Sequence, residues 1–216
     1  MPRHQIKLVA FDMEGCLTDD PTVWEIMHGK LGTWESHGQP YWDDYRAGKF
    51  DYDTFARMDV AVWRDAPLDV LREASAEVAL MRGCRETLAA LKGAGVAAAI
   101  ITNGLSILAD RFRREFGVEH IQANNVVATG GRLTGEIALN VPYDRKGEAV
   151  RRLAAELGLS CDQTATVGDS QSDIAMFREA RIGVAFCPCH QSVADAATHV
   201  VRDRDLGAVA DIVLAG

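Results

Sequence analysis

Two carboxylic acids follow directly on a short apolar segment near the start of the chain. The run from Ile6 to Phe11 predicts a buried strand, and Asp12 and Glu14 come just after it. Gly15 then allows the chain to turn. Ligands of α/β proteins bind at the carboxyl ends of strands. Two carboxylates this close repel each other unless a metal ion neutralises one while the other holds a proton. The pair therefore indicates metal or acid–base chemistry, with a plain acidic turn as the alternative.

A second apolar run, residues 96–101, ends in a hydroxyl group and a glycine. Thr102 offers the hydroxyl, and Asn103 and Gly104 offer backbone N–H groups at the start of a predicted helix. Such groups together can form a cradle for phosphate. Lys146 opens a later predicted helix and could supply a positive charge to phosphoryl oxygens, although a lysine at the start of a helix is usually solvated.

A third apolar segment, residues 164–167, also leads into carboxylates. Asp169 and Asp173 are four residues apart, so they share one face of a helical turn if a helix begins there. Either residue could ligate a metal ion or cap the helix. Asp173 could also ligate through a water molecule or hold Lys146.

Strands that alternate with helices must position these residues, which predicts a parallel sheet covered on both faces. Residues 17–81 differ, because they lack strand alternation and contain all four tryptophans and three of the four tyrosines. We expect this segment to be helical, and each aromatic side chain to belong to its own small core rather than to a ring-binding pocket. Elsewhere the sequence predicts strands over 6–11, 96–101, 164–167, 182–186 and 199–201, a strand with a hairpin over 121–136, and helices over 68–81, 83–92, 105–116, 146–157, 171–180 and 206–214.

The motifs, taken in this order, resemble the haloacid dehalogenase (HAD) superfamily, and specifically its phosphoserine-phosphatase-like branch. Residues 123–137 and 184–201 are similar to that branch as well, so the resemblance covers nearly the whole chain. It implies an α/β fold: a HAD-type Rossmann-like core with a mostly parallel central sheet flanked by helices, and a small helical cap inserted after the first strand. We therefore expect residues 1–16 and 82–216 to form the core and residues 17–81 to form the cap.

The resemblance also implies a Mg²⁺-dependent phosphomonoesterase that acts on a small phosphorylated metabolite. Asp12 is the candidate nucleophile, whose aspartyl-phosphate water then hydrolyses. Mg²⁺ would offset the meeting of two anions, and by resemblance it binds an Asp12 oxygen, the backbone carbonyl of Glu14 and Asp169, with Asp173 as a further candidate. Lys146 completes the implied catalytic set.

Some positions depart from the family pattern. Glu14 stands where an aspartate usually acts as general acid and base, and we expect Glu14 to fill that role with a longer reach. Asp59 occupies the cap position at which phosphoserine phosphatases hold the substrate carboxylate with an arginine, unless the alignment is off by a turn. Arg57 lies roughly 200° around the helix from that position, whereas Arg64 could reach in from the next turn. With Ser172 in place of the usual asparagine, these changes favour a substrate with hydroxyls or an amine over one with an amino-acid carboxylate.

Two other functions stay open at this point. A phosphotransferase or mutase would use the same aspartyl-phosphate and pass the phosphoryl group to an alcohol. A catalytically weak protein could instead keep the fold to bind a phosphorylated ligand.

Composition narrows the classes of partner. The chain has 216 residues, 48% hydrophobic and 25% charged, which is ordinary for a soluble globular protein. A net charge of −8 argues against nucleic-acid binding, and no apolar run approaches the roughly 20 residues that span a bilayer. The N-terminus shows no apolar segment typical of a signal peptide, and the five cysteines are an odd number that does not favour a disulfide framework. We expect a cytoplasmic monomer or homodimer without nucleic-acid or membrane partners.

Overall fold

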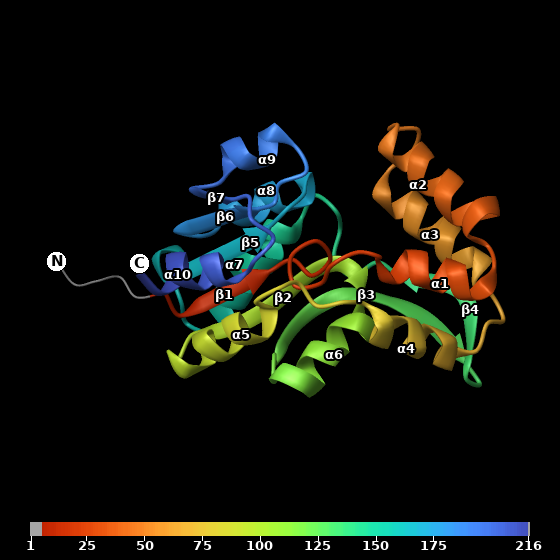
Figure 1. The fold of residues 1–216 in the computed structure, drawn as a ribbon, viewed down its shortest axis with the longest axis horizontal. Helices are drawn as coiled ribbons and strands as arrows, with labels where there is room; N and C mark the ends of the chain where they lie inside the picture. The colour runs from red at the N-terminus through yellow and green to blue at the C-terminus, as the bar shows by residue number, and fades with distance from the viewer. Residues whose placement is uncertain (1–5, 216) are drawn as a thin grey trace.

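A central sheet of seven strands organises the computed structural model, which describes residues 6–215. Residues 1–5 and residue 216 lie outside the described part. Residues 1–5 include the start of the predicted core segment 1–16 and of the stretch on which the signal-peptide prediction depends. The strand order is β4-β3-β2-β1-β5-β6-β7, and neighbours pair in parallel except β3 with β4 (Figure 1). This confirms the predicted α/β fold with a mostly parallel sheet. The strands are β1 (Leu8–Phe11), β2 (Ala97–Leu105), β3 (His120–Thr129), β4 (Arg132–Ala138), β5 (Thr164–Gly168), β6 (Ile182–Phe186) and β7 (His199–Val201).

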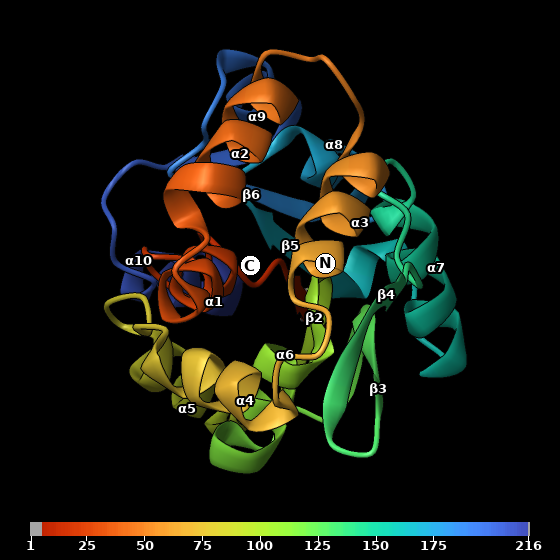
Figure 2. The ribbon, with the colours of Figure 1, turned by 90° about the vertical axis from the view of Figure 1, so that its right-hand side faces the viewer.

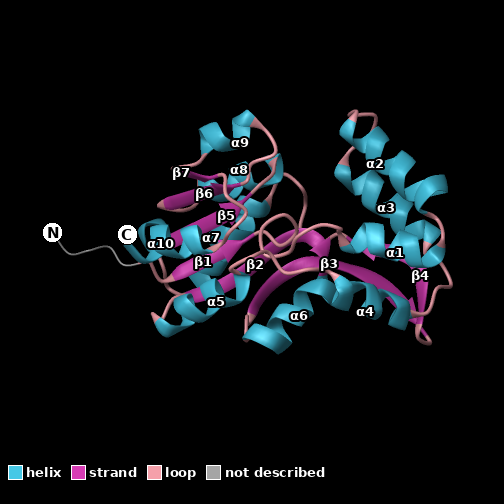
Figure 3. Cartoon of the chain, in the orientation of Figure 1, coloured by secondary structure: helices cyan, strands magenta, loops and turns pink. Residues whose placement is uncertain are grey.

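Helices flank both faces of this sheet (Figure 3). Side chains alternate along β1, so Val9 and Phe11 join one hydrophobic cluster with α5, α6 and α10, whereas Leu8 and Ala10 pack against α7 on the other face. The strands are buried on both faces, which explains their continuous apolar runs. The helices are α1 (Val23–Leu31), α2 (Gln39–Arg46), α3 (Tyr52–Val62), α4 (Leu68–Glu77), α5 (Cys84–Gly93), α6 (Ser106–Phe116), α7 (Lys146–Glu156), α8 (Ile174–Phe177), α9 (Gln191–Ala196) and α10 (Gly207–Ala215).

Helices α1, α2 and α3 stand apart from the rest at one end of the molecule (Figure 1), with a π-helical turn, Trp34–Gly38, between α1 and α2. Figure 2 views the molecule from their side and shows them in front of the strands. The two connections to the rest of the chain run together, since Met81 N donates to Leu17 O (3.0 Å) and Asp19 N donates to Ala79 O (2.9 Å). Helix α4 packs along α6 of the core as well as against α1. The cap boundaries of 17 and 81 stay a prediction.

The hairpin of β3 and β4 reaches across to this helical group. Asp65 N, just after α3, donates to Leu133 O in β4 at 2.8 Å, and Leu68 N donates to Gly131 O at 2.9 Å. The long antiparallel hairpin thus supports α3 from the core side.

Three predicted elements differ from the structure. The helix predicted over 68–81 ends at Glu77, and Leu80 forms a β-bridge with Thr18 instead. The strand predicted over 96–101 continues to Leu105, with a register shift against β3 after Ile101. The helix predicted over 171–180 is a 3₁₀ turn, Gln171–Asp173, followed by the short helix α8. The Asp173 side chain bonds back to the N–H groups of residues 169 and 170, which tightens this turn.

None of the helices within residues 6–215 combines the length and the apolar character that crossing a membrane requires. The cytoplasmic location and the oligomeric state stay predictions from the sequence.

Candidate active site

The three predicted motifs meet because their strands are neighbours. Strand β1 lies between β2 and β5, and Phe11 is opposite both Ile100 and Val167. Parallel strands end at the same edge, so Asp12, Thr102 and Asp169 all follow at that edge. The N–H of Asp12 donates to Val167 O at 2.8 Å, which fixes this residue between the two neighbouring strands.

Lys146 is fully buried between two of the aspartates. Its Nζ atom lies 3.0 Å from Asp12 Oδ2 and 2.8 Å from Asp173 Oδ1. Burial lowers the pKa of Lys146, but the charges of Asp12 and Asp173 more than compensate and hold it above its usual value. The alternative that this lysine is solvated is wrong, and the site contains a fixed positive charge.

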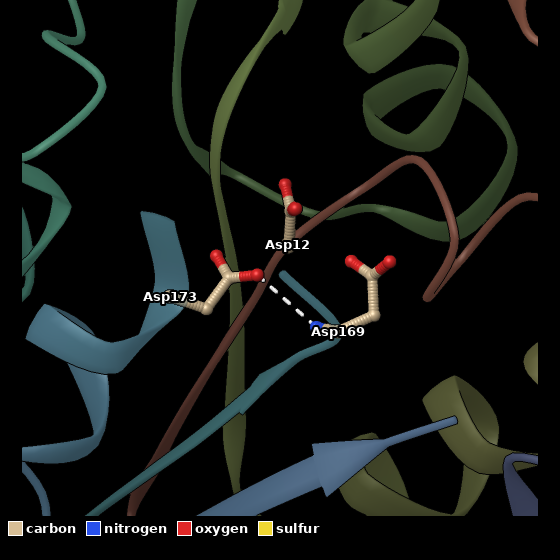
Figure 4. Close-up of side chains that lie close together, drawn as sticks. All are labelled: Asp12, Asp169 and Asp173. Atoms are coloured by element: carbon tan, nitrogen blue, oxygen red, sulfur yellow. Dashed lines mark hydrogen bonds between the residues drawn. The ribbon is translucent and has the colours of Figure 1, made fainter. Parts of the chain in front are cut away.

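Asp173 uses both carboxylate oxygens on protein donors. Oδ1 accepts from Lys146, and Oδ2 accepts from the N–H of Ser170 (2.9 Å) and the Ser170 hydroxyl (3.0 Å). Oδ2 also accepts from the N–H of Asp169 at 3.1 Å (Figure 4). Of the roles considered for Asp173, the geometry favours holding Lys146 and the loop over direct metal ligation.

The aspartates form a compact group that suits a divalent cation. One carboxylate oxygen from each of Asp12, Asp169 and Asp173 lies within 4.8 Å of the others (Figure 4). Burial raises the pKa of Asp169 well above its usual range, and the charges of Asp173 and Asp12 raise it further. A cation would relieve this repulsion, and an all-oxygen donor set fits Mg²⁺. Asp12 and Asp169 are the side chains that would hold it, and the part of the Glu14 backbone carbonyl stays a prediction from the sequence.

Gly15 is required beside this group. Its φ is +81°, and a Cβ atom there would lie 2.7 Å from Asp169 Oδ2. The absence of a side chain therefore lets the Asp169 carboxylate approach the β1 loop.

Burial and hydrogen bonding organise the expected phosphate cradle. Thr102 is buried, and its hydroxyl accepts the N–H of Gly104 at 3.0 Å. The side-chain amide of Asn103 donates to Val141 O at 2.8 Å, and the backbone carbonyl of Asn103 accepts from Asn124 Nδ2 at 2.6 Å. All three predicted cradle residues line the cavity described below. Asn103 and Gly104 lie at the end of β2 rather than at a helix start, because α6 begins at Ser106.

Glu14 lies over the same segment. A Cβ atom on Gly104 would lie 2.7 Å from Glu14 Oε2, so only glycine fits under this carboxyl group. Glu14 Oε1 accepts the N–H of Val23 at 3.3 Å. Burial raises the pKa of Glu14 to about 7, with the hydrogen bond from Val23 limiting the rise and the Asp12 charge adding to it. A carboxyl group with this pKa can both donate and accept a proton near neutral pH.

A cavity of about 500 Å³ extends from these residues to the helical group. Trp63 and Trp24 are buried in the core as expected, and Trp24, Trp34 and Trp42 also line the cavity, which the sequence did not predict. Among the described residues, Asp59 lines the cavity and neither Arg57 nor Arg64 does. The aromatic residues of the lining are Trp24, Trp34, Trp42, Tyr45, Tyr52, Phe55 and Tyr143.

Two residues of the cavity lining could not be predicted from the sequence. Arg46, at the end of α2, and Tyr143, in the loop before α7, carried no motif signal. Tyr52 donates its hydroxyl to the carbonyl of Asn103 at 2.6 Å and stacks on Tyr143 at 5.5 Å between ring centroids. Tyr52 thereby joins α3 to the cradle segment, a contact that depends on how the helices dock.

Known proteins resemble this chain over most of its length. It is 28% identical over 182 residues to the phosphoserine phosphatase of Methanocaldococcus jannaschii, with 84% of this chain and 85% of that protein covered. It is 29% identical over 186 residues to the phosphoserine phosphatase of Streptomyces coelicolor, with 85% of this chain but 45% of that longer protein covered. A solved structure described as a phospho-aspartyl intermediate analogue of phosphoserine phosphatase superposes with a TM-score of 0.86 at 25% identity, and covers 97% of this chain and 99% of that one.

The family itself is shown by the match of residues 9–178 to the haloacid dehalogenase-like hydrolases. That range includes Asp12, Thr102, Lys146, Asp169 and Asp173. The fold, the arrangement of these residues and the phosphoserine phosphatases among its relatives agree with this match. The chain therefore belongs to the haloacid dehalogenase-like hydrolase family.

Proposed function

We propose that this protein is a Mg²⁺-dependent phosphomonoesterase that hydrolyses a small phosphorylated metabolite through an aspartyl-phosphate on Asp12. The position of Asp12 carries the proposal: its buried carboxylate lies in the cavity wall, 3.0 Å from Lys146 Nζ and beside Asp169. The relatives named as phosphoserine phosphatases support the reaction class.

The first half of the reaction joins two anions. A carboxylate oxygen of Asp12 attacks phosphorus, and the bond from phosphorus to the leaving oxygen breaks. Lys146 and the Thr102 segment hold the phosphoryl oxygens, and Lys146 stays charged because Asp173 and Asp12 flank it. When bound, Mg²⁺ supplies positive charge that offsets the repulsion between carboxylate and phosphate.

Glu14 serves both halves of the reaction. It gives its proton to the leaving oxygen, so the alcohol departs neutral. It then takes a proton from water, whose oxygen attacks the phosphorus, and inorganic phosphate leaves while Asp12 returns as a carboxylate. The place of Glu14 over Gly104, beside the phosphate segment, supports this role.

The helical cap closes over the substrate. The hydrogen bond from Tyr52 to the Asn103 carbonyl joins α3 to the cradle, and a substrate that fills the aromatic cavity would displace its water. Such exclusion protects the aspartyl-phosphate from water that is not activated by Glu14.

The test is phosphate release from phosphoserine, a sugar phosphate and a nitrophenyl phosphate, with Mg²⁺ or with a chelator, for wild type and Asp12→Asn. We expect release that requires both the metal and Asp12. Full turnover by Asp12→Asn, or turnover insensitive to the chelator, would contradict the proposal. An acceptor alcohol that lowers free phosphate while alcohol release rises would indicate a phosphotransferase, and binding of esters without turnover would indicate a binding protein.

A further inference from the structure

The cavity continues past the reaction centre into a part lined by Trp24, Trp42, Tyr45, Phe55 and Asp59, which we call the cap pocket. Its rings contact one another: Tyr45 stacks on Phe55 at 5.2 Å between centroids, and Trp42 lies 5.7 Å from Phe55. Trp24 lies 5.8 Å from Phe55 on another side. Aromatic rings present a negative face, and a group of them is suited to a positively charged ligand.

Helix α3 leads from the phosphate cradle into this pocket. Tyr52, Phe55 and Asp59 are spaced to share one face of the helix, and all three line the cavity. Tyr52 contacts the Asn103 carbonyl, and Asp59 lies two turns farther on, about 10 Å along the helix axis. The face therefore leads from the phosphate cradle into the cap pocket.

Asp59 is buried, and one of its carboxylate oxygens makes no hydrogen bond to the described residues. It is 1% exposed, and within the described chain its Oδ1 has no hydrogen-bond partner. The nearest cationic candidate is His28, whose Nε2 lies 3.3 Å away. That nitrogen already accepts the indole N–H of Trp63 at 3.3 Å, and an indole can only donate. His28 Nε2 is therefore shared between the Trp63 indole and Asp59 Oδ1.

A buried carboxylate whose one neighbour is shared in this way is further stabilised by a cation. Burial raises the pKa of Asp59, and the neighbouring His28 and His37 offset only part of that rise. A positively charged ligand in the cap pocket would add a partner.

The remaining charges of the cavity are mostly negative. Apart from the reaction centre, its carboxylates are Asp20, Glu25 and Asp59, and among the described lining residues Arg46 is the one cation other than Lys146. Arg46 is exposed at the end of α2, whereas Asp59 is enclosed. The enclosed part of the cavity therefore favours positive over negative ligand groups.

We propose that the cap pocket binds a positively charged nitrogen of the leaving group, so that the preferred substrate is the phosphomonoester of an amino alcohol that carries an ammonium group and no carboxylate. The inference rests on the proposed function and names its substrate class. Hydrolysis then releases the amino alcohol, with its oxygen protonated by Glu14, and inorganic phosphate.

Matched substrates isolate each charge. Phosphoethanolamine and phosphoserine differ by one carboxylate, and phosphocholine and 3,3-dimethylbutyl phosphate have the same shape but differ by the positive charge. We expect kcat/KM to be at least about tenfold higher for the carboxylate-free and for the charged member of each pair. A preference for phosphoserine that is lost in Arg46→Gln would overturn the proposal, as would equal rates for the second pair.

Variants assign the selectivity to the pocket. Asp59→Asn should lower the ratio of kcat/KM for phosphocholine over its neutral analogue by about tenfold. Asp53→Asn removes the same charge from the same helix at a position that does not line the cavity, and should leave the ratio unchanged. Trp42→Leu, at a wall residue that is 39% exposed, should also lower the ratio, and it covers the case in which Asp59→Asn does not fold.

Binding separates this inference from the proposed function. Wild-type protein that hydrolyses no ester would refute the phosphatase proposal alone, because quenching of tryptophan fluorescence by choline, compared with 3,3-dimethylbutanol, still tests the pocket. We expect choline to bind at least about tenfold more tightly. Equal binding of the two alcohols would refute the cap-pocket proposal, whatever the turnover.

Discussion

Asp173→Asn should unfold the loop that holds Lys146. In the folded protein both Asp173 oxygens face donors: Lys146 Nζ on one side, and two backbone N–H groups with the Ser170 hydroxyl on the other. An asparagine side chain has one acceptor oxygen and one NH₂ group. Whichever way the amide is turned, its NH₂ group faces donors, so one side loses its bonds and gains a repulsive contact.

The cost follows from the burial of these groups. Breaking one partner of a buried ion pair costs about 3–5 kcal/mol. Loss of the Asp173 charge also relieves Asp12 and Asp169, whose pKa values it raises, so we expect the lower end, about 3 kcal/mol. For a chain of this length that corresponds to a fall in Tm of about 6–12 °C.

Asp12→Asn makes the same chemical change a few ångströms away and should do the opposite. Burial and the charge of Asp173 raise the pKa of Asp12 from 3.8 to about 6, so ionised Asp12 is disfavoured in the folded state. The stability linked to this group is therefore present below pH 3.8 and is lost as the pH rises through about 6, a loss of about 3 kcal/mol. Asparagine mimics the protonated acid, so at pH 8 in chelator Asp12→Asn should raise the free energy of unfolding by up to about 3 kcal/mol while abolishing turnover.

Urea unfolding of wild type and both variants at pH 8, in chelator, measures this contrast. A loss below about 1 kcal/mol for Asp173→Asn would refute the reasoning, because the donors would then have found other partners. A loss for Asp12→Asn as large as that for Asp173→Asn would refute the division of these acids into a reactive one and a structural one.

Further predictions concern the acid, the metal loop and the cap. Glu14→Gln should lower kcat by about 10²–10⁴-fold for an alkyl phosphate and far less for a nitrophenyl phosphate, whose leaving group needs no proton; equal losses on both esters would contradict the role of Glu14. Gly15→Ala places a Cβ atom against the Asp169 carboxylate, so the Mg²⁺ concentration for half-maximal activity should rise, and an unchanged titration curve would contradict the metal assignment. Tyr52→Phe removes the hydrogen bond to the Asn103 carbonyl, worth about 1 kcal/mol, and should lower kcat/KM about fivefold and Tm by about 2–4 °C; no kinetic change would show that α3 docks without it.

The sheet and the residues at its edge could be predicted because they depend on local pattern. Continuous apolar runs mark buried parallel strands, and a polar residue directly after such a run lies at the sheet edge. Asp12, Thr102 and Asp169 were therefore predictable as neighbours, although they are far apart in sequence.

Other features depend on contacts that no local pattern encodes. The burial of Lys146 between Asp12 and Asp173 follows from how α7 packs beside the β5 loop, and the spacing of 146 and 173 gives no sign of it. Where the sequence predicted a helix, the chain forms a 3₁₀ turn, because the bonds of the Asp173 side chain to backbone N–H groups compete with helical geometry.

The aromatic residues of the cap show a related limit. Their abundance predicts a small apolar core, and Trp63 and Phe55 are buried accordingly. Whether a further ring faces that core or the cavity depends on the docking of α1, α2 and α3 over the sheet, so the roles of Trp24 and Trp42 emerge only from the structure.

The central claim is that the phosphoryl group passes through Asp12, and acid quenching during turnover with Mg²⁺, followed by mass analysis of peptides, tests it most directly. The account predicts the added mass of one phosphoryl group on the peptide containing Asp12, its absence in chelator, and its accumulation when Glu14→Gln slows hydrolysis. Sustained phosphate release with no phosphorylated Asp12, or with the phosphoryl group on another residue, would contradict it.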